Sequence, residues 1–378
     1  MLTRPAPPLP AIGTPVAEIE TPALILDLDI CEANIATMAD FARAAGIRLR
    51  PHAKSHRCPA LALRQVAAGA VGVCVQTVGE AEAMIGEGVP DVLITNQIVS
   101  EGKLRRIAAL SERARIALCV DDSEHLARAE RVARAEGVSL ECYVEIDVGG
   151  GRCGVLPGEA AAGLAARIAG SEALRFGGLQ AYHGKAQHFE DPEERRDTIA
   201  RAVAFVTETL DALDRRGIAC PIVTGAGTGT HPFEAASGVY GELQAGSYLF
   251  MDTDYARIRG EDGKPLSAVF AHSLFILSSV ISRAKPGQAV ADAGLKSYSR
   301  EMGLPGIAGD AGAVLTGCSD EHSVLGFADD GVACRIGDKL RLIPSHCDPT
   351  VNLHDAIIGY REGCIAEILP VAARGASA

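Results

Sequence analysis

The sequence predicts an α/β protein: a (β/α)8 barrel of the TIM type with a second, C-terminal all-β domain. Two observations predict it. From about residue 47 to residue 250, short β-rich runs alternate with longer Ala-, Arg- and Glu-rich stretches of helical period, as in βα units around a parallel sheet. After Gly260-Glu261-Asp262-Gly263 the long amphipathic stretches end, and short runs separated by Gly, Pro and Asp turns take over.

Eight strands are predicted in the first region, which favours a barrel over an open doubly wound sheet, where about six would be usual. They are Ile47–His52, Val71–Val75, Val92–Thr95, Ile116–Val120, Glu141–Ile146, Gly177–Ala181, Pro221–Thr224 and Glu242–Ala245. We assign residues 21–262 to the barrel domain.

The second region, residues 263–378, is predicted to be a β domain, joined by residues 1–20. Its strand candidates are Ser273–Ser282, Ala289–Ala293, Lys339–Ile343 and Ala356–Gly359. A further strand, Ala23–Asp29, could belong to either domain.

Composition narrows the function classes. The 378 residues carry 48 acidic and 36 basic side chains, a formal charge of −12, without any Lys/Arg block, which excludes nucleic acid and anionic membranes as expected partners. No apolar run reaches the ~18 residues of a spanning helix, and the Pro-rich N-terminus lacks a signal-peptide pattern. The 11 cysteines are scattered without a C-x-x-C pair, which argues against a disulfide framework and a structural zinc site. We therefore expect a cytoplasmic protein.

Active sites of such barrels lie at the carboxyl ends of the strands, and here those positions are strongly polar. They are Pro51-His52-Ala53-Lys54-Ser55-His56, Gln76, Asn96, Asp121-Asp122, Asp147 with the loop Gly149–Gly154, Tyr182-His183-Gly184 with Gln187-His188, Gly225–Thr230, and Gly246-Ser247-Tyr248.

Two features of this rim together suggest pyridoxal phosphate. The glycine-rich loops after strands seven and eight could bring backbone N–H groups close to a phosphate, because no side chain intervenes. Lys54 follows strand one among histidines, where a lysine can lose its proton and form an imine with a carbonyl. Arg152 could then face the pyridine nitrogen, or it could form an ion pair at the rim.

A third cluster, Ser345-His346-Cys347-Asp348-Pro349, lies in the predicted β domain. If the run from Leu340 stays extended to Asp348, His346 and Asp348 share one face, and an imidazole with a carboxylate suits Mg²⁺, Mn²⁺ or Zn²⁺. The alternative is a turn in which Asp348 caps a backbone N–H.

Seven motifs in order along the chain resemble the metal-activated D-threonine aldolases and the closely similar 3-hydroxyaspartate aldolases. These families belong with the alanine-racemase-like, fold-type III pyridoxal-phosphate enzymes. The motifs are Thr21-Pro22-Ala23-Leu24, Arg50-Pro51-His52-Ala53-Lys54, Gly149–Gly154, Gln180-Ala181-Tyr182-His183-Gly184, Leu243-Gln244-Ala245-Gly246-Ser247-Tyr248, Asp292-Ala293-Gly294-Leu295-Lys296 and His346-Cys347-Asp348-Pro349-Thr350.

The resemblance implies a role for each candidate site residue. Lys54 becomes the Schiff-base lysine, Arg152 the partner of the pyridine nitrogen, His188 the base near the substrate hydroxyl with Asp320 nearby, and His346 and Asp348 the metal ligands. The remaining cofactor-binding residues are His52, Gln76, Tyr182, Thr224, Gly225, Gly227, Thr228, Gly229, Gly246, Ser247 and Tyr248. The chain departs from the family pattern at Gln76-Thr77, where Gln-Lys is frequent, and at Gly225-Ala226-Gly227, where three glycines are frequent.

The implied activity is cleavage of a small D-3-hydroxy amino acid, of the D-threonine or 3-hydroxyaspartate type, to glycine and an aldehyde by a homodimer. Asp348 stands where the related dehydratases carry cysteine, which favours aldol cleavage over elimination. Three alternatives stay open: a dehydratase, an amino-acid racemase with Tyr298 as second base, and a non-catalytic pyridoxal-phosphate carrier. The length beyond Gly260 and the His346/Asp348 pair argue against a carrier.

Overall fold

A computed structural model describes residues 9–309, 312–327 and 334–377. The chain divides into two compact units. The barrel unit comprises Ile35–Tyr248, Arg257–Leu266 and the chain from Gly375 onward, and the β unit comprises the rest of the described chain. Residues 1–20 were predicted to be part of the β domain, and residues 1–8 of this segment lie outside the described residues. Among the described residues, no helix is long and apolar enough to cross a membrane.

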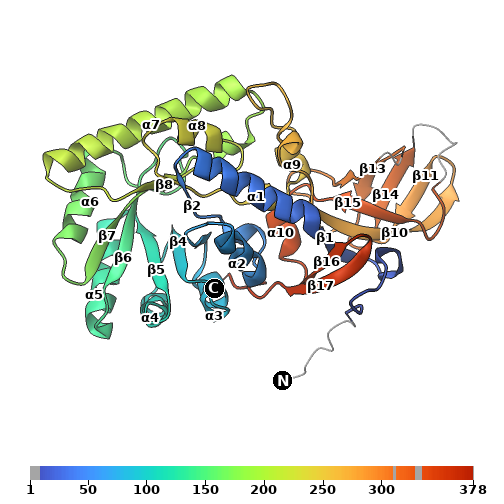
Figure 1. Ribbon diagram of the computed structural model, residues 1–378, viewed down its shortest axis with the longest axis horizontal. Helices are drawn as coiled ribbons and strands as arrows, with labels where there is room; N and C mark the ends of the chain where they lie inside the picture. The colour runs from blue at the N-terminus through green and yellow to red at the C-terminus, as the bar shows by residue number, and fades with distance from the viewer. Residues whose placement is uncertain (1–8, 310–311, 328–333, 378) are drawn as a thin grey trace. The chain divides into compact units, whose positions relative to one another are not determined.

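Eight parallel strands form the sheet of the barrel unit, and all eight correspond to predicted strands (Figure 1). In sheet order they are β2 (Arg48–Leu49), β9 (Glu242–Leu243), β8 (Val223–Gly225), β7 (Leu174–Ala181), β6 (Leu140–Glu145), β5 (Arg115–Val120), β4 (Asp91–Gln97) and β3 (Val73–Val75). The first and last strands meet, because Val71 N donates to Leu49 O at 2.9 Å and His52 forms a parallel bridge with Cys74. The predicted α/β barrel is confirmed.

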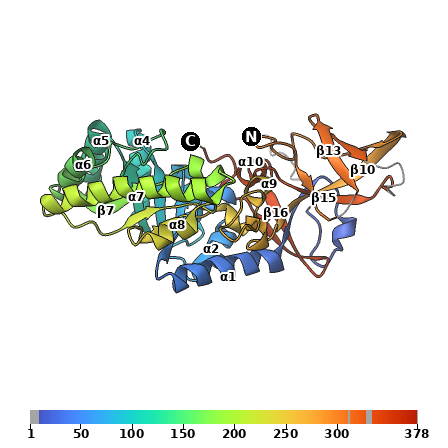
Figure 2. The same cartoon turned by 90° about the horizontal axis from the view of Figure 1, so that it is seen from above.

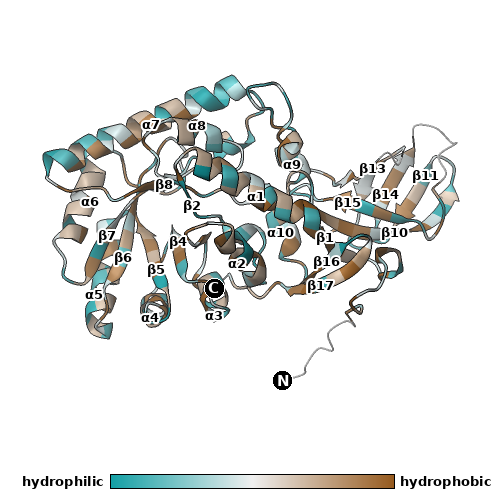
Figure 3. Cartoon of the chain, in the orientation of Figure 1, coloured by the Kyte–Doolittle hydropathy of each residue, from teal (hydrophilic) through white to brown (hydrophobic). Residues whose placement is uncertain are grey.

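Helices follow the strands and cover the outside of this sheet (Figures 1 and 2). They are α2 (Pro59–Ala67), α3 (Val78–Gly86), α4 (Glu101–Leu110), α5 (Ser123–Glu136), α6 (Glu159–Ala169), α7 (Pro192–Arg215) and α8 (His231–Ala236), while α1 (Leu28–Ala44) continues from the β unit. Asp122 and Asp191 cap α5 and α7 by accepting N–H bonds at 2.7 and 2.9 Å. Figure 3 shows a largely apolar β5 and a mixed polar and apolar α7, the pattern of a helix with one buried face.

The nine-stranded sheet of the β unit runs β13-β14-β11-β10-β1-β16-β17, with β15 pairing with β10 and β12. The bounds are β1 (Ala23–Asp27), β10 (Leu274–Lys285), β11 (Gln288–Ala291), β12 (Gly306–Ile307), β13 (Ala313–Cys318), β14 (Ser323–Phe327), β15 (Lys339–Ile343), β16 (Ala356–Arg361) and β17 (Cys364–Pro370). Strand β1 lies between β10 and β16, with Ile25 opposite Phe275 and Ile358. This strand, which the sequence could not assign to either domain, therefore belongs to the β unit. These three side chains are buried in one apolar cluster.

The structure decides between the two conformations that the sequence left open at His346. The chain does not stay extended from Leu340 to Asp348, because β15 ends at Ile343 and a short helix, α10 (Cys347–Val351), begins after His346. Pro344 cannot donate to a ladder, and Pro349 lies in the first turn of α10, where a missing N–H costs nothing. Thr350 Oγ1 also donates to His346 O at 2.8 Å, which stabilises the turn.

Candidate active site

Lys54 lies on a short 3₁₀ helix, Ala53–Ser55, directly after the first barrel strand. The ring of His52 beside it is buried and held from two neighbouring strands, with Nε2 3.0 Å from both Thr95 Oγ1 and Gln76 Nε2. Gln76 Nε2 also donates to Thr95 Oγ1 at 3.1 Å. The structure therefore brings two predicted residues, His52 and Gln76, together at the base of the lysine.

The two predicted glycine-rich loops are joined to each other. Tyr248 N donates to Thr228 Oγ1 at 3.0 Å, and Gly229 N donates to Gln187 Oε1 at 3.1 Å. Side chains have no room here, since a Cβ on Gly227 would lie 2.5 Å from Gln187 Oε1 and one on Gly229 would lie 2.3 Å from Gln187 O. Gln187 thus braces the loop, a role that no sequence pattern indicated.

Several buried N–H groups of these loops are available to a ligand. Within the described part of the chain, the backbone N–H groups of Gly227, Thr228 and Ser247 have no hydrogen-bond acceptor, and all three residues are buried. A buried N–H without an acceptor costs on the order of 1–3 kcal/mol, so such a cluster of donors is expected to serve a bound anion. The loops therefore fit the phosphate of pyridoxal phosphate.

Thr224, predicted to bind the cofactor, is hydrogen-bonded to side chains inside the barrel. Its hydroxyl donates to Glu242 Oε1 at 2.9 Å and accepts from Gln244 Nε2 at 2.8 Å. Gln244 in turn pairs with Gln180 through both side-chain amides, at 2.7 and 3.1 Å. These residues form a polar layer in the barrel interior, and a contact of Thr224 with the cofactor stays a prediction.

Arg152 extends from a loop that Asp147 organises by accepting the N–H groups of Gly149 and Gly151 at 2.9 and 3.1 Å. Its guanidinium group lies 3.7 Å from Glu145 Oε1 and 5.7 Å from the ring centroid of Tyr182. Its side chain is 58% exposed and so is accessible to a ligand. The rim ion pair that the sequence left open is present, and contact with a pyridine nitrogen stays a prediction.

The loop after β7 (Leu174–Ala181) forms a 3₁₀ helix, Lys185–His188, that ends at the predicted base His188. At its start, Ala186 N donates to His183 Nδ1 at 3.1 Å, and burial lowers the pKa of His183. His183 is a site residue that the roles assigned above omit, although its position at a strand end could have revealed it.

The predicted metal ligands are close to each other in the β unit. His346 Nε2 lies 3.8 Å from Asp348 Oδ1, and Nδ1 lies 3.0 Å from Glu301 Oε2. Because a carboxylate can only accept, Nδ1 carries a proton in this contact, and Nε2 is the ring nitrogen on the side of Asp348. The donor set thus fits a divalent cation, although the described residues contain no group of three or more His, Cys, Asp or Glu that could hold a metal.

Two further predicted residues of the β unit do not join this pair. Asp320 is exposed in the turn between β13 and β14, where its carbonyl accepts from Lys296 N. Tyr298, the candidate second base, is buried with its hydroxyl 2.6 Å from Ser323 Oγ, and burial raises its pKa to about 12. A phenol in that environment is a poor base near neutral pH.

Comparisons with known proteins agree with this geometry. A family model described as alanine racemase, N-terminal domain, matches residues 26–254, and one for a serine dehydratase domain matches residues 273–360. A 3-hydroxy-D-aspartate aldolase of Paracoccus denitrificans (strain Pd 1222) is 46% identical over 97% of this chain and 95% of its own. A D-threonine aldolase of an Arthrobacter species is 43% identical over 98% of this chain and 97% of its own.

Solved structures agree as well. The crystal structure of D-threonine aldolase from Filomicrobium marinum is 46% identical and superposes with a TM-score of 0.94, covering 98% of this chain and 100% of that one. The D-threo-3-hydroxyaspartate dehydratase of a Delftia species is 27% identical with a TM-score of 0.82, covering 94% of this chain and 98% of that one.

Proposed function

This chain belongs to the alanine-racemase-like family that includes the D-threonine and 3-hydroxy-D-aspartate aldolases, and we propose that its substrates are D-3-hydroxy amino acids, cleaved to glycine and an aldehyde. It is a carbon–carbon lyase with a pyridoxal-phosphate fold. One observation carries the proposal. A single chain contains Lys54, the glycine-rich cradle and the His346/Asp348 pair, and its aldolase relatives match it over nearly its full length.

In this proposal the barrel unit holds the cofactor. The N–H groups of Gly227, Thr228 and Ser247 bind its phosphate, and Lys54 carries its carbonyl carbon. Bound pyridoxal phosphate supplies an electron sink for the electrons of the broken Cα–Cβ bond. Arg152 lies against Tyr182 and Glu145, which orient its fixed positive charge toward a ligand at the rim.

The proton of the substrate hydroxyl is the group that must leave before the carbon–carbon bond breaks. His188 accepts it in this proposal, since an imidazole has a pKa suited to proton transfer near neutral pH. His346 and Asp348 would hold a divalent cation, Mg²⁺ or Mn²⁺ or else Zn²⁺, which lowers the pKa of a bound hydroxyl. Glu301 fixes the His346 tautomer that this role requires.

The decisive experiment separates the aldolase from a dehydratase and a racemase by product analysis. Holoenzyme is incubated with D-threonine, L-threonine and 3-hydroxyaspartate isomers, with and without a chelator. We expect glycine and an aldehyde from a D isomer, lost on chelation while most cofactor absorbance remains. Ammonia and a 2-oxo acid as main products would establish a dehydratase, and full activity without metal would revive the racemase.

Asp348→Ala tests the metal site. We expect loss of cleavage and of metal dependence in the variant, with an unchanged unfolding transition. Asp320→Ala, which alters an exposed carboxylate in the same unit, gauges whether that residue contributes. We further propose a homodimer in the cytoplasm, which size-exclusion chromatography with light scattering and cell fractionation would test.

A further inference from the structure

A cavity at the opposite, N-terminal end of the barrel strands has no role in the proposed chemistry. Its volume is about 210 Å³, and Arg48, Arg115, Arg175, Glu141 and Tyr143 line it with four apolar or small residues. Arg48 begins β2, Arg115 begins β5 and Arg175 is the second residue of β7, so the cavity lies where the strands start. Three arginines around one small cavity are notable in a chain of net charge −12.

The ion pairs of this cavity leave some donors free. Arg115 is fully engaged, because Nε and Nη2 donate to Glu141 at 2.9 and 2.5 Å and Nη1 donates to Asp91 at 3.2 Å. Arg175 uses only Nη2, which donates to Glu141 Oε2 at 2.6 Å. Both oxygens of Glu141 therefore accept from arginines already.

Arg48 is the least satisfied of the three. Its Nη2 lies 3.1 Å from Glu242 Oε2, but within the described chain its buried Nε has no hydrogen-bond partner. Glu242 Oε1 accepts from Arg50 Nε at 2.9 Å, and Arg50 also binds Asp91. The four guanidinium groups thus face three carboxylates, which leaves an excess positive charge at this end of the barrel.

A neutral donor completes the set. Tyr143 is 1% exposed, lines the cavity, and has no hydrogen-bond partner for its hydroxyl among the residues that the structure describes. Its ring packs with Leu93, Ala117 and Ile222, so its position does not depend on the hydroxyl. The hydroxyl is not one of the fully buried polar atoms that lack a partner in the described chain, so water or a molecule in the cavity can reach it.

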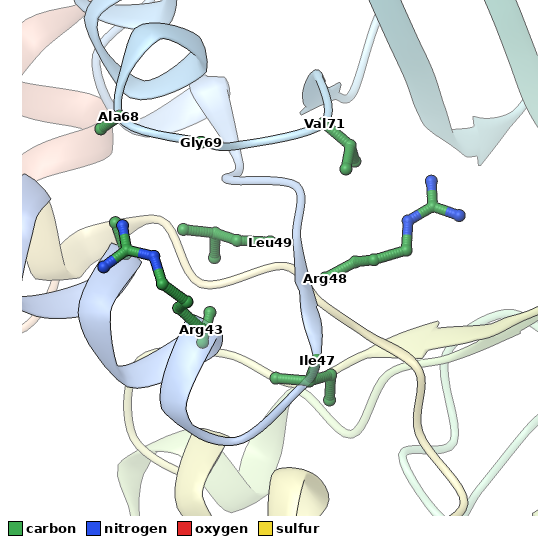
Figure 4. A pocket seen from close by; sticks show the side chains of 9 residues that line it. Arg43, Ile47, Arg48, Leu49, Ala68, Gly69 and Val71 are labelled. Carbon is green, nitrogen blue, oxygen red and sulfur yellow. The ribbon is translucent and has the colours of Figure 1, made fainter.

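The adjoining cavity differs and serves as a contrast. It measures about 230 Å³ and shares Arg48, but its other lining residues are apolar or small apart from Arg43. Figure 4 shows the guanidinium groups of Arg43 and Arg48 pointing away from each other rather than converging. The two cavities thus differ in their lining, since three arginines and a tyrosine line the first, whereas this one has two arginines among apolar or small residues.

We propose that the cavity at the start of the strands binds one small oxyanion, a carboxylate or a phosphate, between Arg48 and Arg175, with the Tyr143 hydroxyl as a third donor. A volume of about 210 Å³ accommodates such an ion but not a nucleotide or a peptide. Charge-assisted hydrogen bonds from guanidinium groups favour planar or tetrahedral oxyanions over chloride. The site is separate from the glycine-rich cradle, which lies at the carboxyl ends of the strands.

The experiment titrates holoenzyme, whose cradle is filled by cofactor, with inorganic phosphate or with acetate at matched ionic strength, by calorimetry. We expect saturable binding of at least one probe, and the two arms identify which. Tyr143→Phe should weaken it about tenfold, the usual effect of losing a hydrogen bond to a charged group. Arg113→Gln, an exposed arginine outside the cavity, should bind as the unmodified protein does.

Arg175→Gln provides a second variant in case Tyr143→Phe does not fold, since Arg175 is 60% exposed and Glu141 keeps Arg115. It too should weaken binding about tenfold, with cofactor absorbance unchanged. Absence of saturable binding by either probe, or equal affinity in the folded variants, would overturn the proposal. Neither result would bear on the aldolase proposal, which is tested by product analysis.

Discussion

The two ends of the barrel treat their polar groups in opposite ways. At the carboxyl ends, Lys54, Arg152 and several buried N–H groups are presented to a ligand. At the start of the strands, Arg50 is buried between Glu242 and Asp91, and Arg115 binds Glu141 in a bidentate pair. The first end leaves the backbone N–H groups of Gly227, Thr228 and Ser247 without acceptors in the described chain, which costs stability, whereas the second pairs most of its charges.

This contrast predicts that substitutions at the carboxyl ends mainly change activity, and those at the starts mainly change stability. The cavity at the start of the strands is the exception, because the buried Nε of Arg48 there has no partner in the described chain. Two predictions test the contrast and two more concern the stability of the glycine-rich loop, in order of decreasing expected effect.

The largest effect is expected for Lys54→Ala. Removing the amine that carries the cofactor should lower kcat on the order of 10³-fold or more, because a nucleophile in covalent catalysis has no substitute. The visible absorption band of the lysine-linked cofactor should disappear, while the thermal unfolding midpoint changes little. If the band persists in the variant, the cofactor is attached to another lysine.

The next effect is a loss of stability for Arg50→Met at the strand starts. The variant removes the positive charge that pairs with the buried carboxylate of Glu242 and the largely buried Asp91. This loss should lower the free energy of unfolding by about 3–5 kcal/mol. Denaturant titration measures it.

Arg106→Gln is the matched control for this loss. Arg106 pairs with Glu82 at 2.6 Å, but both side chains are about 40% exposed, so the change should cost under about 1 kcal/mol. Equal losses in the two variants would show that burial is not what distinguishes these ion pairs.

A pH effect is expected behind the glycine-rich loop. Burial raises the pKa of Glu234 to about 7, although Thr230 donates to it, so its folded-state pKa exceeds the unfolded value of 4.5. The unfolded chain ionises first, and stability therefore falls as pH rises from about 4.5 to 7. Glu234→Gln abolishes this fall, and its advantage over the unmodified protein should grow by about 2–3 kcal/mol between pH 5 and pH 8.

Denaturant titrations at the two pH values measure this difference. Burial lowers the pKa of His231 to about 4, so the stabilisation by its neutral form is lost as the pH falls from 6.5. Both proteins contain His231, and its effect therefore cancels in the difference between their free energies of unfolding. A constant difference between the variants at the two pH values would show that Glu234 is already ionised at pH 5.

The smallest effect is expected at Ala226, which lies in the cradle with φ +67°. A left-handed conformation costs alanine about 1–2 kcal/mol, and glycine loses about 0.5–1 kcal/mol more on ordering. Ala226→Gly should therefore raise the free energy of unfolding by under about 1 kcal/mol, with cofactor affinity retained. Destabilisation by that amount would mean that the buried methyl group contributes more than the backbone strain costs.

Local periodicity was sufficient to determine the barrel of this protein. Alternating strand and helix patterns located all eight strands, and glycines at strand ends located the cradle, because both signals lie within a few residues of chain. The same reasoning selected Lys54 as a candidate site residue, because residues that follow a parallel strand of a barrel lie at the rim where active sites form.

Only the tertiary structure decided which distant segments meet. Strand β1 pairs with β10 and β16, more than 240 residues away, and period-two alternation cannot specify a partner. Gln187 at the glycine-rich loop and Glu301 at His346 were likewise unpredicted, because each acts through a contact made by a separate segment. At His346 the sequence left an extended run and a turn open, and two prolines, Pro344 and Pro349, favour the helical turn that the structure shows.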